Sequence, residues 1–195
     1  MALLILGIVL FLGIHLTQAF VPDFRARMVS RIGEGAWKGL YSLVSLLGLC
    51  LIIYGYGESR LTTGVLYTPP VFLRHLALLL MIFAFIILAA GFLPAGHIAM
   101  KTKHPQVLAV KIWASAHLLA NGETNSVILF GAFLAWGVLV RISLKRRERA
   151  GEKVLPVFKS ARYDVLAVAI GLVAYLAFIW RLHEWLVGVQ PIAMG

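Results

Sequence analysis

Residues 71–93 of the chain read VFLRHLALLLMIFAFIILAAGFL, and apart from Arg74 and His75 the whole stretch is apolar. A helix needs about 20 mainly apolar residues to cross the hydrocarbon core of a bilayer, so this stretch predicts a transmembrane helix. Across the 195 residues, 61% are hydrophobic and 13% are charged. Soluble domains are about half apolar and about a quarter charged. We therefore exclude a water-soluble globule and expect the chain to fold in lipid.

Similar stretches recur along the chain, and two of them are less apolar than the rest. Residues 126–142 are short but uncharged until Arg141, whereas residues 107–120 are interrupted by Lys111, Ser115 and His117. The six expected spans are residues 2–20, 40–56, 71–93, 107–120, 126–142 and 165–189.

The distribution of basic residues supports all six spans, including the fourth. Short loops rich in Lys and Arg stay in the cytoplasm. With six spans, the basic clusters after the first span, around the start of the fourth and between the fifth and sixth fall on one side, which leaves Arg60, Arg74 and Arg181 on the other. The sequence thus predicts an all-α polytopic integral membrane bundle. It has six transmembrane helices in a single domain, residues 1–195, with both termini on the non-cytoplasmic side.

The net charge of +10 is explained by this topology. Nucleic acid binding would need a basic face on a soluble fold, so we expect no nucleic acid partner. The expected partner is the lipid bilayer, whose anionic headgroups attract Lys and Arg. The single cysteine, Cys50, excludes a disulfide scaffold and a cysteine-based zinc site.

Histidines dominate the ionisable residues that the spans carry into the membrane, where such residues mark functional sites. His15 lies in the inner half of the first span, whereas His75, His117 and His183 lie near the outer ends of the third, fourth and sixth. At about 1.5 Å of rise per residue, His75 and His117 are expected to share a depth. His183 lies only slightly off that level.

Two neutral imidazoles on facing helices can ligate a haem iron, and helix bundles commonly build cofactor sites in this way. The haem propionates need positive charge near an interface, which Arg74 or Arg181 can supply. Copper and zinc are less suited, because near these histidines the spans offer only one carboxylate, that of Glu184, and no thiolate. For each histidine the alternative is a structural hydrogen bond between helices.

Two motifs at the fourth span are specific: residues 104–106 read HPQ, and residues 112–122 read IWASAHLLANG. They resemble the NnrU family of membrane proteins, whose relatives include the plant and cyanobacterial 15-cis-ζ-carotene isomerases. The further matching positions are GEGAWKGLYSL at residues 33–43, Pro69, Pro70, Arg74, His75 and His15. The likeness covers most of the chain up to about Arg149 and is weaker in the last helix.

The resemblance implies a multi-span protein of the bacterial inner (cytoplasmic) membrane, associated with denitrification and nitric oxide metabolism. The isomerase relatives use haem b with histidine ligation to convert a cis double bond in a polyene, and their motif positions match His117 and His15. They carry a cysteine three residues before the motif histidine, where this chain has Ala114. A mechanism that uses that thiol is therefore not expected here.

The second metal ligand stays open at this point. The resemblance points to His15, whereas the depth estimate favours His75, because His15 lies roughly 10 Å nearer the cytoplasm than His117. The expected site therefore binds haem b through His117, with His15 or His75 as the second metal ligand and Arg74 as a further cofactor contact. No catalytic residue is assigned.

Three functions follow from these observations. The first is a haem-containing component of nitrogen oxide metabolism. The second is a haem-dependent cis-trans isomerase of a lipid-soluble polyene such as ζ-carotene. The third is a cofactor-free scaffold or assembly factor, whose partners would be respiratory or denitrification proteins of the membrane.

Overall fold

The computed structural model describes residues 1–152 and 155–192, with the side chains of all of these except Gln18 and Pro22. Its regular structure is helical, which confirms the all-α class. The helices are α1 (Ala2–Phe20), α2 (Pro22–Ile32), α3 (Glu34–Ser59), α4 (Val71–Ala90), α5 (His97–Thr102), α6 (Pro105–Ala120), α7 (Thr124–Arg149), α8 (Arg162–Ala177), the π-helical turn η1 (Phe178–Leu182) and α9 (His183–Val187).

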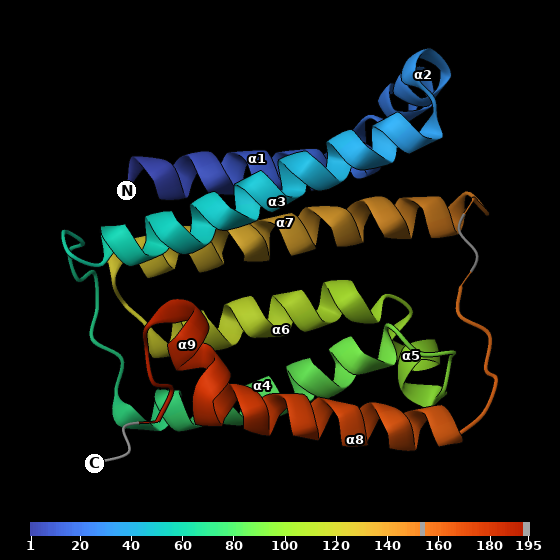
Figure 1. The fold of residues 1–195 in the computed structure, drawn as a ribbon. Coiled ribbons are helices and arrows are strands. Elements are labelled where there is room, and N and C mark those ends of the chain that lie inside the picture. Colours follow the sequence, from blue (N-terminus) through green and yellow to red (C-terminus); the bar gives the residue numbers. More distant parts are fainter. Residues whose placement is uncertain (153–154, 193–195) are drawn as a thin grey trace.

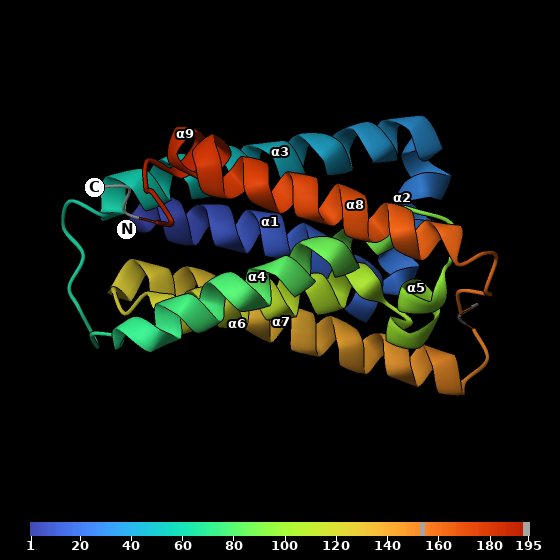
Figure 2. The ribbon, with the colours of Figure 1, turned by 90° about the horizontal axis from the view of Figure 1, so that it is seen from below.

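The long helices lie side by side, and each runs in the opposite direction to the long helix before it in the chain (Figure 1). Helix α1 packs between α3 and α7, α7 packs on α6, α6 on α4, and α4 on α8. The end of the chain turns back at α9, which reaches α3 and so brings the last helix towards the first pair (Figures 1 and 2). The helices therefore form a curved row whose two ends approach each other.

Small residues allow α1 and α3 to pack closely. A Cβ atom added at Gly7 would lie 2.6 Å from the backbone nitrogen of Ile52, and one at Gly48 would lie 2.8 Å from the backbone nitrogen of Phe11. Close backbone approach at small residues is the usual way in which membrane helices associate. The main core lies beside this contact and consists of Leu4, Ile8, Leu12, Ile52, Ala114, Leu129 and Phe130.

The expected number of six spans is wrong for this structure. In the described part of the chain, four segments are long and apolar enough to cross a membrane: Glu34–Ser59, Val71–Ala90, Thr124–Arg149 and Arg162–Val187. Helix α6 has 16 residues, or about 24 Å at 1.5 Å per residue, against a hydrocarbon core of about 30 Å. Helix α1 has 19 residues, and its described apolar segment is Ala2–Thr17. Helix α6 packs between α4 and α7, and α1 packs between α3 and α7.

The basic residues gather at one end of the bundle, which we call the basic end. It carries α2, α5 and the connection between α7 and α8 (Figure 1). The opposite end carries residues 60–70, 121–123 and 188–192. The cations of the basic end include Arg25, Arg27, Arg31, Lys101, Lys103, Arg146, Arg147, Arg149, Lys159 and Arg162.

Candidate functional site

His117 lies in the last turn of α6, half-buried at the opposite end of the bundle. Its Nδ1 donates a hydrogen bond of 2.9 Å to the backbone carbonyl of Trp113, one turn earlier. A carbonyl can only accept, so Nδ1 carries the proton and Nε2 keeps its lone pair. This is the tautomer in which an imidazole binds a metal through Nε2.

Aromatic rings hold the His117 side chain in place. The Phe130 ring of α7 stacks on it with a centroid distance of 4.5 Å and an interplanar angle of 29°. The Trp113 ring lies 5.2 Å from it and also contacts Phe130 and Phe133. The imidazole is therefore oriented from both α6 and α7.

Residues 65–67 form hydrogen bonds with the end of α6 that carries His117. The Tyr67 hydroxyl lies between the carbonyls of Leu118 and Asn121, which share its single hydrogen. The side-chain amide of Asn121 donates to the carbonyl of His117 at 2.9 Å. A Cβ atom at Gly122 would overlap the Tyr67 carbonyl, so the close approach of these two backbone segments requires glycine at position 122. These contacts satisfy carbonyls at the helix end and hold His117 at a set height.

His183 is brought next to His117 by the last helix. The two imidazole rings have centroids 6.3 Å apart and planes that differ by 15°. His183 Nδ1 donates to the Val189 carbonyl at 2.7 Å, which leaves its Nε2 lone pair unused as well. The sequence places His183 near the level of His117, but depth alone did not select it as a ligand. The feature that distinguishes His183 is the π-helical turn directly before it, and the pattern of apolar residues in the sequence does not predict that turn.

His75 and Arg74 are exposed on α4. In the part of the chain that the structure describes, neither side chain has a hydrogen bond, an ion pair or a ring contact. Helix α4 buries Ala77 and Ala84 instead. Successive helical residues are about 100° apart, so His75 lies about 200° around the helix from Ala77. The structure therefore does not bring His75 to His117.

His15 occupies a separate place against α3 and α7. Its Nδ1 donates to the Phe11 carbonyl at 2.6 Å, as His117 does to Trp113. Its ring lies 5.3 Å from Tyr41 and 6.4 Å from Trp136. Among the described residues, no ring contact joins His15 directly to His117. They are linked through the rings of Phe11, Phe133, Trp113 and Phe130.

The indole nitrogen of Trp136 is buried beside His15 and has no hydrogen-bond partner among the described residues. Leaving a buried donor without an acceptor costs free energy. The neighbourhood of His15 therefore offers a free imidazole nitrogen and a free N–H group, although it lies apart from the His117 and His183 pair.

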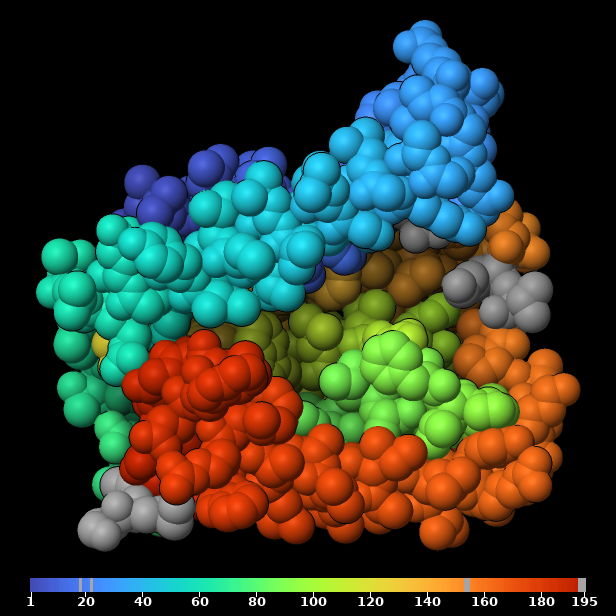
Figure 3. Space-filling model, in the orientation of Figure 1, coloured from blue at the N-terminus to red at the C-terminus, as the bar shows by residue number. Residues whose placement is uncertain are grey.

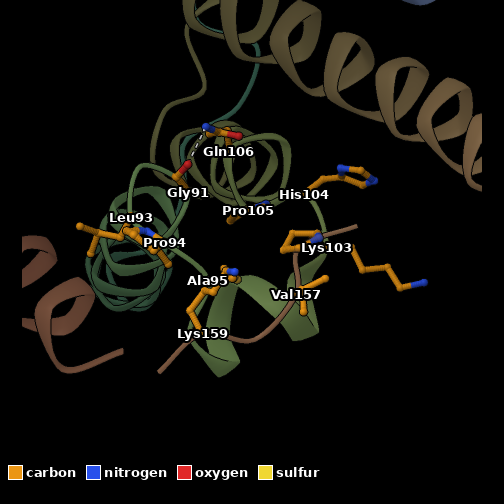
Figure 4. A pocket seen from close by; sticks show the side chains of 13 residues that line it. Gly91, Leu93, Pro94, Ala95, Lys103, His104, Pro105, Gln106, Val157 and Lys159 are labelled. Atoms are coloured by element: carbon orange, nitrogen blue, oxygen red, sulfur yellow. Dashed lines mark hydrogen bonds between the residues drawn. The ribbon is translucent and has the colours of Figure 1, made fainter. Parts of the chain in front are cut away.

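The structure has a hollow near the basic end with both polar and apolar lining residues, shown in Figure 4, with a volume of about 410 Å³. Its polar lining includes Lys103, His104, Gln106 and Lys159, and Gln106 donates to the Gly91 carbonyl at 2.9 Å. It surrounds the start of α6, whereas His117 lies near the end of that helix. The hollow is therefore separate from the imidazole pair.

An apolar hollow of about 460 Å³ lies on the last helix, lined by Leu176, Ala177, Ile179, Trp180 and Ile192. It borders the π-helical turn that precedes His183. The space-filling view also shows a recess between α3 and α9, with atoms of α6 and α7 at its floor (Figure 3). Apolar space therefore lies beside the segment that carries His183.

The metal-binding side chains near His117 suit a haem better than a bare metal ion. A bare zinc ion takes three or four protein ligands. In the part of the chain that the structure describes, no cluster of three or more His, Cys, Asp or Glu residues forms such a set. A haem brings four equatorial nitrogens of its own and needs only one or two imidazoles from the protein. Two histidines with unused Nε2 atoms therefore suit a haem.

The comparison with known families gives a match over nearly the whole chain. The model of the family described as "NnrU protein" matches residues 3–191, a range that includes the last helix and His183. No curated protein and no solved structure matches the chain.

Proposed function

The chain belongs to the NnrU family, and we propose that it is a haem b protein of the bacterial inner membrane, in which His117 holds the iron and nitric oxide is the ligand handled. The four long apolar helices and the family membership support a membrane protein. The link to nitric oxide and denitrification rests on the family resemblance described above.

The state of the His117 imidazole carries this proposal. Its Nδ1 is tied to the Trp113 carbonyl, its ring is stacked on Phe130, and its Nε2 has no hydrogen bond among the described residues. A carbonyl that accepts from the distal nitrogen of a ligating histidine sets the tautomer and the orientation of the ring. A histidine with a purely structural role would instead form hydrogen bonds with both ring nitrogens, or form one with another helix.

A bound haem b would supply an iron centre that takes up a diatomic gas. The protein's own part would be to ligate the haem through His117 and to exclude water with the rings of Trp113, Phe130 and Phe133. The surrounding apolar helices would admit nitric oxide from the lipid.

The test is the absorbance spectrum of the protein purified in detergent from cells supplied with iron and porphyrin precursor. We expect a Soret band and the pyridine haemochrome of haem b, and a shift of the band when nitric oxide is added to the reduced protein. His117→Ala should lose the band, whereas the matched control His75→Ala should keep it, because His75 is exposed and without contacts. A colourless, folded wild type would overturn the proposal and favour a cofactor-free scaffold.

The apolar hollow beside the π-helical turn favours a second candidate, a haem-dependent cis-trans isomerase of a lipid-soluble polyene. Its lining side chains, Leu176, Ala177, Ile179, Trp180 and Ile192, suit a hydrocarbon chain. Incubation of ζ-carotene with the haem-loaded protein in liposomes, followed by chromatography of the isomers, distinguishes the candidates. Conversion that is lost in His117→Ala would support the isomerase, and no conversion would leave the nitric oxide function.

A further inference from the structure

We propose, resting on the haem function above, that His183 is the second axial ligand and that the π-helical turn of the last helix delivers it opposite His117. Neither the motifs of the fourth span nor the depth estimate assigns this role. Three independent features of the structure support it, namely the ring geometry, the hydrogen bonds of the two imidazoles and the backbone around His183.

The ring geometry fits two imidazoles that share one metal. The centroids of His117 and His183 lie 6.3 Å apart, and the ring planes differ by 15°. Two imidazoles that bind one metal from opposite sides, each at about 2.0 Å from the nitrogen, have ring centres about 6 Å apart. Direct stacking would bring the rings closer, as the 4.5 Å between His117 and Phe130 shows.

The hydrogen bonds leave the same nitrogen unused on both rings. His117 Nδ1 donates to the Trp113 carbonyl at 2.9 Å, and His183 Nδ1 donates to the Val189 carbonyl at 2.7 Å. Each Nε2 therefore carries a lone pair, and neither has a hydrogen-bond partner among the described residues. Two neutral imidazoles with Nε2 lone pairs and carbonyl-anchored Nδ1 atoms are what axial ligation requires.

The backbone before His183 is unusual. Residues 178–182 form a π-helical turn between α8 and α9. Such turns are rare, occur frequently at functional sites, and change the direction in which the following side chains leave the helix. His183 is the first residue after the turn. An uninterrupted α-helix would carry this side chain to a different face.

The backbone after His183 is fixed by two contacts. Gly188 ends α9 with φ +71°, a left-handed conformation that glycine adopts readily. Its carbonyl accepts a hydrogen bond of 3.2 Å from Nη1 of Arg60, in the connection after α3. The turn at Gly188 brings the next carbonyl, that of Val189, to Nδ1 of His183. Arg60 thus anchors the turn that orients the proposed ligand.

The other two candidate ligands have no ring contact with His117 among the described residues. His75 is exposed on α4 and has no ring contact among the described residues. His15 has a carbonyl-anchored Nδ1, but its ring is joined to His117 only through a series of other rings. The structure therefore favours His183 over both.

The experiment compares the spin state of the ferric haem in the wild type and in His183→Ala, by absorbance and electron paramagnetic resonance. Two imidazoles give a low-spin six-coordinate iron, whereas one gives a high-spin five-coordinate iron. We expect the wild type to be low-spin. His183→Ala should keep its haem through His117, lose the low-spin signal, and regain it when free imidazole fills the vacated position. His75→Ala is the matched control and should stay low-spin.

The outcomes separate this inference from the function on which it rests. A colourless wild type overturns both. A haem-containing His183→Ala that remains low-spin overturns the His183 assignment alone, and so does a loss of the low-spin signal in His15→Ala but not in His183→Ala. If His183→Ala fails to elute as the wild type does in size-exclusion chromatography, His183→Gln replaces it. Rescue by imidazole then shows an open ligand position, which a purely structural histidine would not produce.

Discussion

Nε2 of His104 lies 2.6 Å from Oε1 of Glu148, although 44 residues separate them in the sequence. The same carboxylate accepts from Nη1 of Arg141 at 2.7 Å and pairs with Nζ of Lys103 at 3.4 Å. The side chains of His104 and Glu148 are only 8% and 10% exposed. One carboxylate therefore joins the start of α6 to the end of α7 at the basic end.

Glu148→Gln should destabilise the protein. The substitution keeps the shape of the side chain but removes its charge, so two cations lose their partner in a largely buried position. We expect the Tm of the detergent-solubilised protein to fall by roughly 5 °C. Glu152→Gln is the matched control, because Glu152 is 62% exposed and, among the described residues, forms one ion pair, with Arg147 at 3.6 Å. Its Tm should change by less than about 1 °C, as for most surface ion pairs. Equal shifts in the two variants would contradict this role for Glu148.

Two glycines provide a matched test of helix packing. Gly48→Ala places a Cβ atom 2.8 Å from the backbone nitrogen of Phe11, so α1 and α3 must move apart. Overpacking of this kind costs about 1–3 kcal/mol. Gly131→Ala meets nothing within 4 Å and should stabilise α7 by up to about 1 kcal/mol, since alanine is the better helix former. Denaturation in mixed micelles measures both. A stable Gly48→Ala variant would show that α1 and α3 are not in close contact in the membrane.

The orientation of the bundle is predicted from its charges. Because Lys and Arg gather at the basic end, we expect that end to face the cytoplasm. In a Cys50→Ser background, Thr62→Cys lies at the opposite end and Glu152→Cys at the basic end. A membrane-impermeant maleimide added to intact spheroplasts should label Thr62→Cys but label Glu152→Cys only after lysis. The reverse pattern would invert the predicted topology.

Which histidines meet at the candidate site could not be predicted from the sequence. The rise per residue placed His75, His117 and His183 near one level, but it did not say which of them meet. Contact depends on the helix face as well as on depth. His75 lies on the face of α4 turned away from Ala77, whereas His183 is brought to His117 by a local change from α-helical to π-helical geometry.

The number of spans also differs between the sequence-based expectation and the structure. Residues 2–20 and 107–120 are apolar enough to lie inside a membrane bundle, and basic residues flank them in a consistent pattern. Helix α6, with 16 residues, is nevertheless shorter than the hydrocarbon core, and in the described part of the chain four other segments meet the length for a span. Helix α6 is short because His104 and Pro105 begin it and residues 121–123 end it. The residues at these two turns set where α6 begins and ends, and mean hydropathy over a stretch of sequence does not detect them.

The sequence by itself determined that the chain is a helical membrane protein of its family and that its cations share one end, because both depend on composition and on the order of residues along the chain. The tertiary structure alone decided that His117 meets His183 rather than His75 or His15. That choice depends on which helix faces pack together and on one widened turn, and both arise from contacts between residues far apart in the sequence.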